Sequence, residues 1–214
     1  MPRKTFVVLL AGVAAMATLG LIMAPRLING APSGVTAVPE RHADGSGPLG
    51  SGESDPHGAV SHTFSRNAPG GVWTLGIRLC LVSGDKTAIL DSVGPSRSVG
   101  NGYKHLGSFV RRFIPAQGEN PIGGVVGFPP KVSGALSPVK GFAVTDRCQG
   151  PNPDMSKPYT ELLLGFAKGS GTEGGGWYGV DVGYFVGGQH HIVELRYDIL
   201  MCGTTVTSDY CATH

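Results

Sequence analysis

The chain has 214 residues, enough for one domain with a sizeable core, and combines 15% charged residues with 41% hydrophobic residues and 35 glycines. Its formal net charge of +2 provides no electrostatic footprint for nucleic acid, so a nucleic-acid partner is not expected. The sequence shows no internal repeat.

The N-terminal segment is apolar enough to cross a membrane. Residues 5–24 include no charged side chain, and roughly 20 apolar residues span a bilayer core as a helix. Arg3 and Lys4 precede the segment, which places the N-terminus in the cytoplasm by the positive-inside rule. We therefore predict a transmembrane signal anchor over residues 1–24. The alternative is a secretory signal peptide cleaved near Ala15-Met16-Ala17, which would release a secreted protein.

Residues 25–70 are rich in Gly, Pro, Ser, Ala and Asp and have no apolar periodicity. Such a composition predicts a disordered linker between the membrane and a folded domain over residues 71–214. His42, His57 and His62 lie in this segment without metal-site spacing, so we interpret them as solvated.

The folded domain opens with a strand over Val72–Val82, in which the odd-numbered residues are apolar and Arg78 and Cys80 lie on the other face. A turn follows, and Thr87–Val93 is predicted to return antiparallel to the first strand and to end at Pro95.

Tyr103–Ile114 combines aromatic and basic residues and is predicted to form an edge strand or an exposed loop. Lys104, His105, Arg111 and Arg112 are the candidate residues for a surface patch that contacts anionic head groups or a cell-surface polymer. The alternative is that these charges only protect an exposed edge.

The clearest hairpin pattern lies near the C-terminus. Apolar residues alternate through Tyr178–Val186 and again through Ile192–Cys202, and Gly187-Gly188 lies between them. The polar face of this hairpin and the glycine-rich loop Gly169–Gly176 are candidate binding surfaces. The polar residues of that face are Asp181, Glu194, Arg196 and Asp198.

About seven short strands separated by turn signals predict an all-β fold, an antiparallel β-sandwich with an Ig-like general shape. An open β-barrel is the alternative architecture. No helix longer than a turn is expected after Ala24, since Gly and Pro interrupt every window.

All four cysteines fall in the predicted external domain, which favours two disulfides in an oxidising compartment. Chain proximity favours the pairs Cys80–Cys148 and Cys202–Cys211, while crossed pairings and free buried thiols stay open as alternatives.

No catalytic residue, metal site or cofactor is predicted. A copper site built from His190, His191, Cys202, Cys211 and His214 lacks the axial Met, and adjacent histidines on a strand point to opposite faces. The chain has no Gly-x-Ser-x-Gly elbow, and Gly169–Gly176 lacks the Lys-Ser/Thr of a phosphate-binding loop.

The sequence thus predicts a membrane-tethered extracytoplasmic binding or structural module. Its expected partners are the lipid bilayer, through the N-terminal helix, and a cell-surface protein or polymer. The alternative function is an exported hydrolase or metal-dependent enzyme with dispersed catalytic residues. A pocket with two carboxylates, or a histidine in contact with a carboxylate, would favour that alternative.

Overall fold

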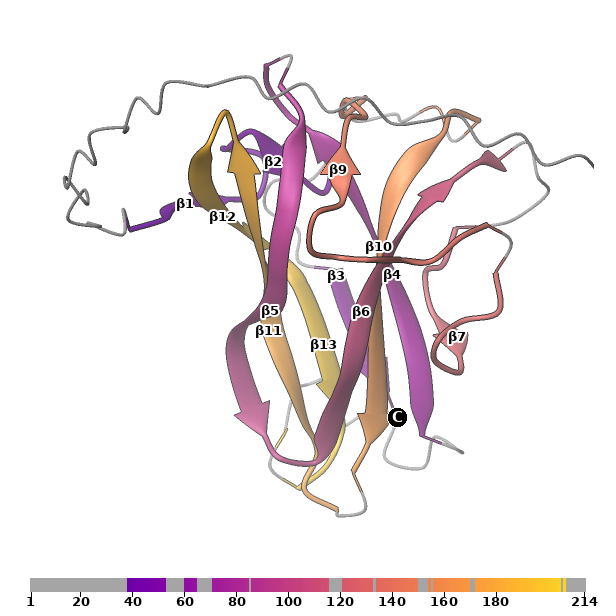
Figure 1. The fold of residues 1–214 in the computed structure, drawn as a ribbon. Coiled ribbons are helices and arrows are strands. Elements are labelled where there is room, and N and C mark those ends of the chain that lie inside the picture. The colour runs from indigo at the N-terminus through magenta and orange to yellow at the C-terminus, as the bar shows by residue number, and fades with distance from the viewer. Residues whose placement is uncertain are drawn as a thin grey trace, which may run out of the picture. The chain divides into compact units, whose positions relative to one another are not determined.

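The computed structural model describes residues 38–52, 60–64, 71–84, 86–115, 121–132, 134–149, 154, 156–169, 172–204 and 206. These residues form two β-sheets, mostly antiparallel, and contain no α-helix (Figure 1). The all-β prediction is confirmed for this part of the chain. No helix within it is long and apolar enough to cross a membrane, and the predicted anchor over residues 1–24 lies outside the described residues.

The first sheet comprises β1 (Glu40–Ala43), β3 (Val60–Phe64), β5 (Ala88–Gly100), β9 (Ala143–Val144), β11 (Gly175–Val186), β12 (Gln189–Leu195) and β13 (Tyr197–Met201). Its centre is β11, which pairs antiparallel with β5 along one edge and with β12 and β13 along the other. The strands β1 and β3 pair in parallel with β12 and β13.

The second sheet comprises β2 (Leu49–Gly50), β4 (Val72–Leu81), β6 (Tyr103–Phe113), β7 (Val125–Val126), β8 (Ser137–Pro138) and β10 (Tyr159–Lys168). Its centre is β10, which pairs antiparallel with β4 and with β6. The two-residue strands β2 and β7 pair with β4, and β8 pairs with β6.

The facing sides of the two sheets contribute to one hydrophobic core. Because side chains alternate along a strand, only every second residue of β4 reaches this core, as the sequence pattern predicts. The core residues from the central strands of both sheets are Trp73, Leu75, Ile77, Leu79 and Leu81 of β4, Leu162, Leu164 and Phe166 of β10, and Trp177, Val180, Val182 and Tyr184 of β11.

The predicted glycine hairpin is confirmed, since β11 and β12 are joined at Gly187-Gly188. Both glycines have positive φ, 60° and 84°, which a two-residue hairpin turn of this type requires. The second half of the hairpin is not one strand, however, because Arg196 separates β12 from β13.

The predicted phase of β11 is wrong at one residue. Trp177, not Tyr178, contributes to the core, and Tyr178 is half-buried outside it. Gly179 has a φ of +72°, a conformation that disturbs regular alternation and favours glycine. The phase therefore shifts between Trp177 and Val180.

The strand predicted over Thr87–Val93 lies almost entirely within β5, but its predicted antiparallel pairing with β4 is wrong. β5 lies in the other sheet, where it pairs with β11 and β9. It also continues through Pro95 to Gly100. At Pro95, β5 pairs with β11 on one edge and with no described strand on the other. Proline is tolerated there because its missing N–H interrupts no hydrogen bonds to a second neighbouring strand.

Three strands fall within residues 25–70, for which we predicted a disordered linker. These are β1, β2 and β3, and each pairs with a strand from the C-terminal part of the chain or with β4. The linker prediction is therefore wrong for these residues. Composition missed them because short edge strands gain stability from partners distant in sequence, and not from apolar periodicity of their own.

The predicted disulfide Cys80–Cys148 is present and joins β4 to the segment before β10. Cys202 is also disulfide-bonded, and no described cysteine is free. Its predicted partner, Cys211, lies outside the described residues.

Candidate functional site

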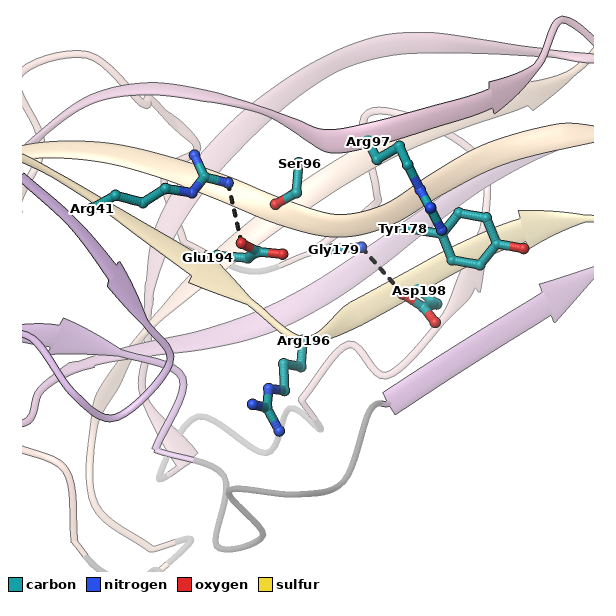
Figure 2. Close-up of a pocket in the computed structure, with 8 residues that line it drawn as sticks. All are labelled: Arg41, Ser96, Arg97, Tyr178, Gly179, Glu194, Arg196 and Asp198. Atoms are coloured by element: carbon teal, nitrogen blue, oxygen red, sulfur yellow. Dashed lines mark hydrogen bonds and ion pairs between the residues drawn. The ribbon is translucent and has the colours of Figure 1, made fainter. Parts of the chain in front are cut away.

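A polar cavity of about 370 Å³ lies on the face of the first sheet that points away from the hydrophobic core. Its lining comes from five strands, β1, β5, β11, β12 and β13, and from the residue between β12 and β13, as Figure 2 shows. The lining residues are Arg41, Ser96, Arg97, Tyr178, Gly179, Glu194, Arg196 and Asp198.

Two interruptions of regular strand structure lie among the residues that line this cavity. Gly179 interrupts the alternation of β11, and Arg196 separates β12 from β13. A side chain at position 179 would crowd the cavity, because a Cβ there would lie 3.0 Å from Ser96 Oγ and 3.3 Å from Glu194 Oε1. Glycine thus provides both the positive φ and the open space.

Arg41 of β1 forms one wall of the cavity through ion pairs with two carboxylates. Its guanidinium donates two hydrogen bonds to Asp181, both 2.7 Å long, and one of 3.1 Å to Glu194. The hydrogen bonds that Arg41 donates to Asp181, and secondarily the one that it donates to Glu194, raise the pKa of Arg41. The paired, fork-like geometry fixes the orientation of Arg41 beside the carboxylates.

Asp181 also accepts a hydrogen bond from the Ser96 hydroxyl, which ties β5 to β11 under the cavity. Asp198 of β13 accepts a 3.1 Å bond from the Gly179 backbone N–H. These acceptors therefore position the backbone and side chains that line the cavity.

An aromatic platform borders the other side of the cavity. The Arg97 guanidinium lies 4.5 Å from the centroid of the Tyr178 ring, close enough for a cation–π interaction. Tyr178 and Arg97 are cross-strand partners on β11 and β5. In Figure 2, Arg97 lies along Tyr178, whereas Arg196 extends away from the Arg41–Glu194 pair.

The cavity carries both signs of charge. Three arginines and two carboxylates line it, and Asp181 adds a third carboxylate behind Arg41. Guanidinium groups only donate hydrogen bonds and carboxylates only accept them, while Ser96 and Tyr178 hydroxyls do both. The arrangement suits a ligand with many alternating donors and acceptors rather than a highly charged one.

Four polar residues that the sequence analysis placed on the hairpin face belong to this region. Glu194, Arg196 and Asp198 line the cavity, and Asp181 holds Arg41. The sequence analysis missed Arg41, Ser96 and Arg97. Arg41 lies 140 residues before Asp181, so no local pattern brought the two together.

The predicted basic patch on β6 is not a single surface. Arg111 is 1% exposed and donates a 2.6 Å hydrogen bond to the equally buried Glu161. Arg112 pairs with Asp146, and Lys104 is exposed. His105 is half-buried, with its ring 4.7 Å from the ring of Trp177.

Burial explains why Arg111 was misplaced. On β10, Glu161 lies directly opposite Arg111, and its second carboxylate oxygen accepts a 2.7 Å bond from the Ile122 backbone N–H. The segment around Ile122 thus covers this face of the second sheet. A neighbouring cavity of about 490 Å³ is lined by Arg111 and mainly apolar residues of 121–132, and it offers few polar groups to a ligand.

A group of metal-ligating side chains lies beside the polar cavity, on the opposite face of β1. Its members are Glu40, His42 and His191. The sequence analysis interpreted His42 as solvated, but the structure shows it half-buried beside His191, which is 6% exposed.

The chain matches no protein-family model, no curated protein and no solved structure. The functional argument therefore depends on the geometry of the described residues.

Proposed function

We propose that the protein is a membrane-tethered, extracytoplasmic binding module whose β-sandwich, Ig-like in general shape, recognises a hydroxyl-rich ligand such as a cell-surface oligosaccharide. The observation that carries the proposal is the polar cavity on the outer face of the first sheet, which is lined by acidic, basic and aromatic side chains. Two sheets that share one core support the sandwich architecture.

The hydrogen-bonding inventory of the cavity favours a sugar over other ligand classes. Arg97 and Arg196 offer several donors, Glu194 and Asp198 offer acceptors, and Tyr178 adds an aromatic ring. A highly anionic polymer would meet repulsion from the carboxylates. A purely apolar ligand would leave the charged groups desolvated without partners.

The alternative, an exported hydrolase or metal-dependent enzyme, has two observations in its favour: the ring nitrogens of His42 and His191 lie within 4 Å of Glu40, and Glu194 and Asp198 line the polar cavity. Both carboxylates, however, already accept hydrogen bonds: Glu194 from Arg41 and Asp198 from the Gly179 N–H. Carboxylates held in this way act as fixed acceptors rather than as proton donors, which favours binding over acid–base catalysis.

The location is part of the proposal. The apolar segment over residues 5–24 would anchor the protein in the cell membrane, and the disulfide Cys80–Cys148 is consistent with an oxidising compartment. The location is tested by measuring the intact mass of the protein in the membrane and supernatant fractions. Full-length protein in the membrane fraction supports the anchor, whereas a shorter soluble form supports signal cleavage and secretion.

Binding is tested by titrating full-length protein in detergent with labelled neutral and uronic-acid oligosaccharides. We expect Arg97→Ala and Arg196→Ala each to weaken binding roughly 10-fold or more, because each removes charge-assisted hydrogen bonds. Lys140→Ala is the matched control, since Lys140 is 84% exposed and outside the cavity. Equal affinity in all three variants, or no binding of either sugar class, would contradict the proposal.

A further inference from the structure

Three side chains with metal-ligating atoms converge at the edge of the first sheet. His42 Nε2 lies 3.2 Å from His191 Nδ1, His191 Nδ1 lies 3.5 Å from Glu40 Oε2, and His42 Nε2 lies 3.7 Å from the same oxygen. Among the described residues, no other group of three or more His, Cys, Asp or Glu side chains brings its ligand atoms this close together.

The strand pairing explains the convergence. Glu40 and His42 are two residues apart on β1, so their side chains lie on the same face. The parallel pairing of β1 with β12 places Glu40 opposite His191. His191 has the same phase on β12 as the core residues Val193 and Leu195, so the three side chains meet on the inner face of the sheet at its edge.

The surroundings hold both imidazoles in place. The ring of His191 stacks on Tyr184, with centroids 5.3 Å apart and planes 21° apart. Gly47 leaves room for the other ring, because a Cβ at that position would lie 2.6 Å from His42 Cγ. Gln189 donates a 3.2 Å hydrogen bond to Glu40 Oε2, which orients the carboxylate.

We propose that Glu40, His42 and His191 bind a divalent transition-metal ion, with Zn²⁺ as the ion that fits best, through one carboxylate oxygen and two ring nitrogens. Two histidines and one carboxylate are a common ligand set for zinc sites that keep a fourth position open. Glu40 is 54% exposed, so solvent reaches the carboxylate of this group.

The separations match the ion. The nearest point equidistant from three atoms that are 3.2, 3.5 and 3.7 Å apart lies about 2.0 Å from each of them, and zinc bonds to nitrogen and oxygen measure roughly 2.0–2.2 Å. No side chain therefore has to move far to coordinate the ion.

The chemistry of the ligand set also favours a bound ion. A neutral ring nitrogen is the form that coordinates metal. A hydrogen bond between the two rings alone would account for the 3.2 Å contact, but it would not require the carboxylate within 4 Å of both nitrogens.

A bound metal ion would attach β1 more firmly to β12. This strand is held to the sheet by a four-residue parallel pairing with β12, and a shared ion would link the two strands through side chains. Arg41 lies between the two ligands of β1 and points to the polar cavity. Metal binding is thus independent of the oligosaccharide proposal, although it would steady one wall of that cavity.

The test uses full-length protein in detergent, stripped with a chelator and then titrated with Zn²⁺ by calorimetry and with Co²⁺ by visible absorption. We expect one ion per chain and a higher melting temperature with Zn²⁺, because the ion binds only the folded state. His42→Ala and His191→Ala should weaken Zn²⁺ binding roughly 100-fold or more.

His190→Ala is the matched control, since His190 stacks on Phe185 and does not belong to the cluster. It should bind Zn²⁺ as the unmodified protein does. Glu40→Gln, a near-isosteric change at an exposed position, keeps the test informative if a histidine variant fails to fold. Absence of one-to-one Zn²⁺ binding, or equal affinity in His42→Ala and Glu40→Gln and the unmodified protein, would overturn the proposal.

Discussion

Arg41 and His42 are neighbours on β1, yet their side chains lie on opposite faces of one sheet. Arg41 forms a 2.7 Å ion pair with Asp181 beside the polar cavity, and His42 lies 3.2 Å from His191 on the other face. A single edge strand therefore contributes to both sites that we propose. This arrangement follows directly from the alternation of side chains along a strand.

Replacing Arg41 should cost little stability. The Arg41 side chain is 46% exposed, and exposed ion pairs contribute about 1 kcal/mol or less to the free energy of unfolding. We expect a loss of this size for Arg41→Ala in urea denaturation, together with weaker oligosaccharide binding. A loss of several kcal/mol would show instead that Arg41 has a structural role.

Replacing Arg111 should cost much more. Arg111→Met leaves Glu161 buried without its charged partner, and such a change destabilises by about 3–5 kcal/mol. Arg112→Met is the matched control on the adjacent residue, because the Arg112–Asp146 pair is 46% exposed on the arginine side. Urea denaturation should separate the two variants clearly, and the double variant Arg111→Met/Glu161→Leu should recover part of the loss. Similar losses for Arg111→Met and Arg112→Met would refute the importance of the buried pair.

Removal of the Cys80–Cys148 disulfide should destabilise the fold. The bond closes a loop of 68 residues, and the chain-entropy model assigns such a loop about 4 kcal/mol. We expect the double variant Cys80→Ala/Cys148→Ala to lose roughly 2–5 kcal/mol in denaturant titrations under oxidising conditions. Adding reductant should bring the unmodified protein at least as low as this variant. No change in the denaturation midpoint of the variant would contradict the prediction.

Protonation of His105 should weaken the fold at acidic pH. Burial between the rings of Phe166 and Trp177 lowers the pKa of His105, so the folded state binds this proton less tightly than the unfolded state does. The free energy of unfolding should therefore fall as pH drops below about 6.5, the ordinary pKa of histidine. His105→Phe should show a shallower fall in denaturation measured across this range. The same slope in both proteins would show that other groups account for the pH dependence.

Local patterns in the sequence predicted the strands that carry their own apolar alternation. β4 and the β11–β12 hairpin were recognised because every second residue is apolar and glycines mark the turn. The same patterns placed Glu194, Arg196 and Asp198 on a polar face. The pairing Cys80–Cys148 also followed from chain proximity.

These local patterns did not predict which of the two sheets each strand joins. β5 follows β4 after a short turn, but it joins the opposite sheet, where its main partner is β11, a strand distant in sequence. Nor did the sequence indicate that Arg111 is inside, since a buried arginine depends on Glu161 and on the cover provided by Ile122.

The sequence by itself determined the all-β class, the alternation of the long strands and the glycine turn within the described residues, because each depends on residues close together in the chain or on composition. Only the tertiary structure decided how β1 docks against β12 and which side chains meet there. Arg41 and Asp181 are 140 residues apart, and His42 and His191 are 149 apart, so both contacts arise from strand pairing across most of the chain.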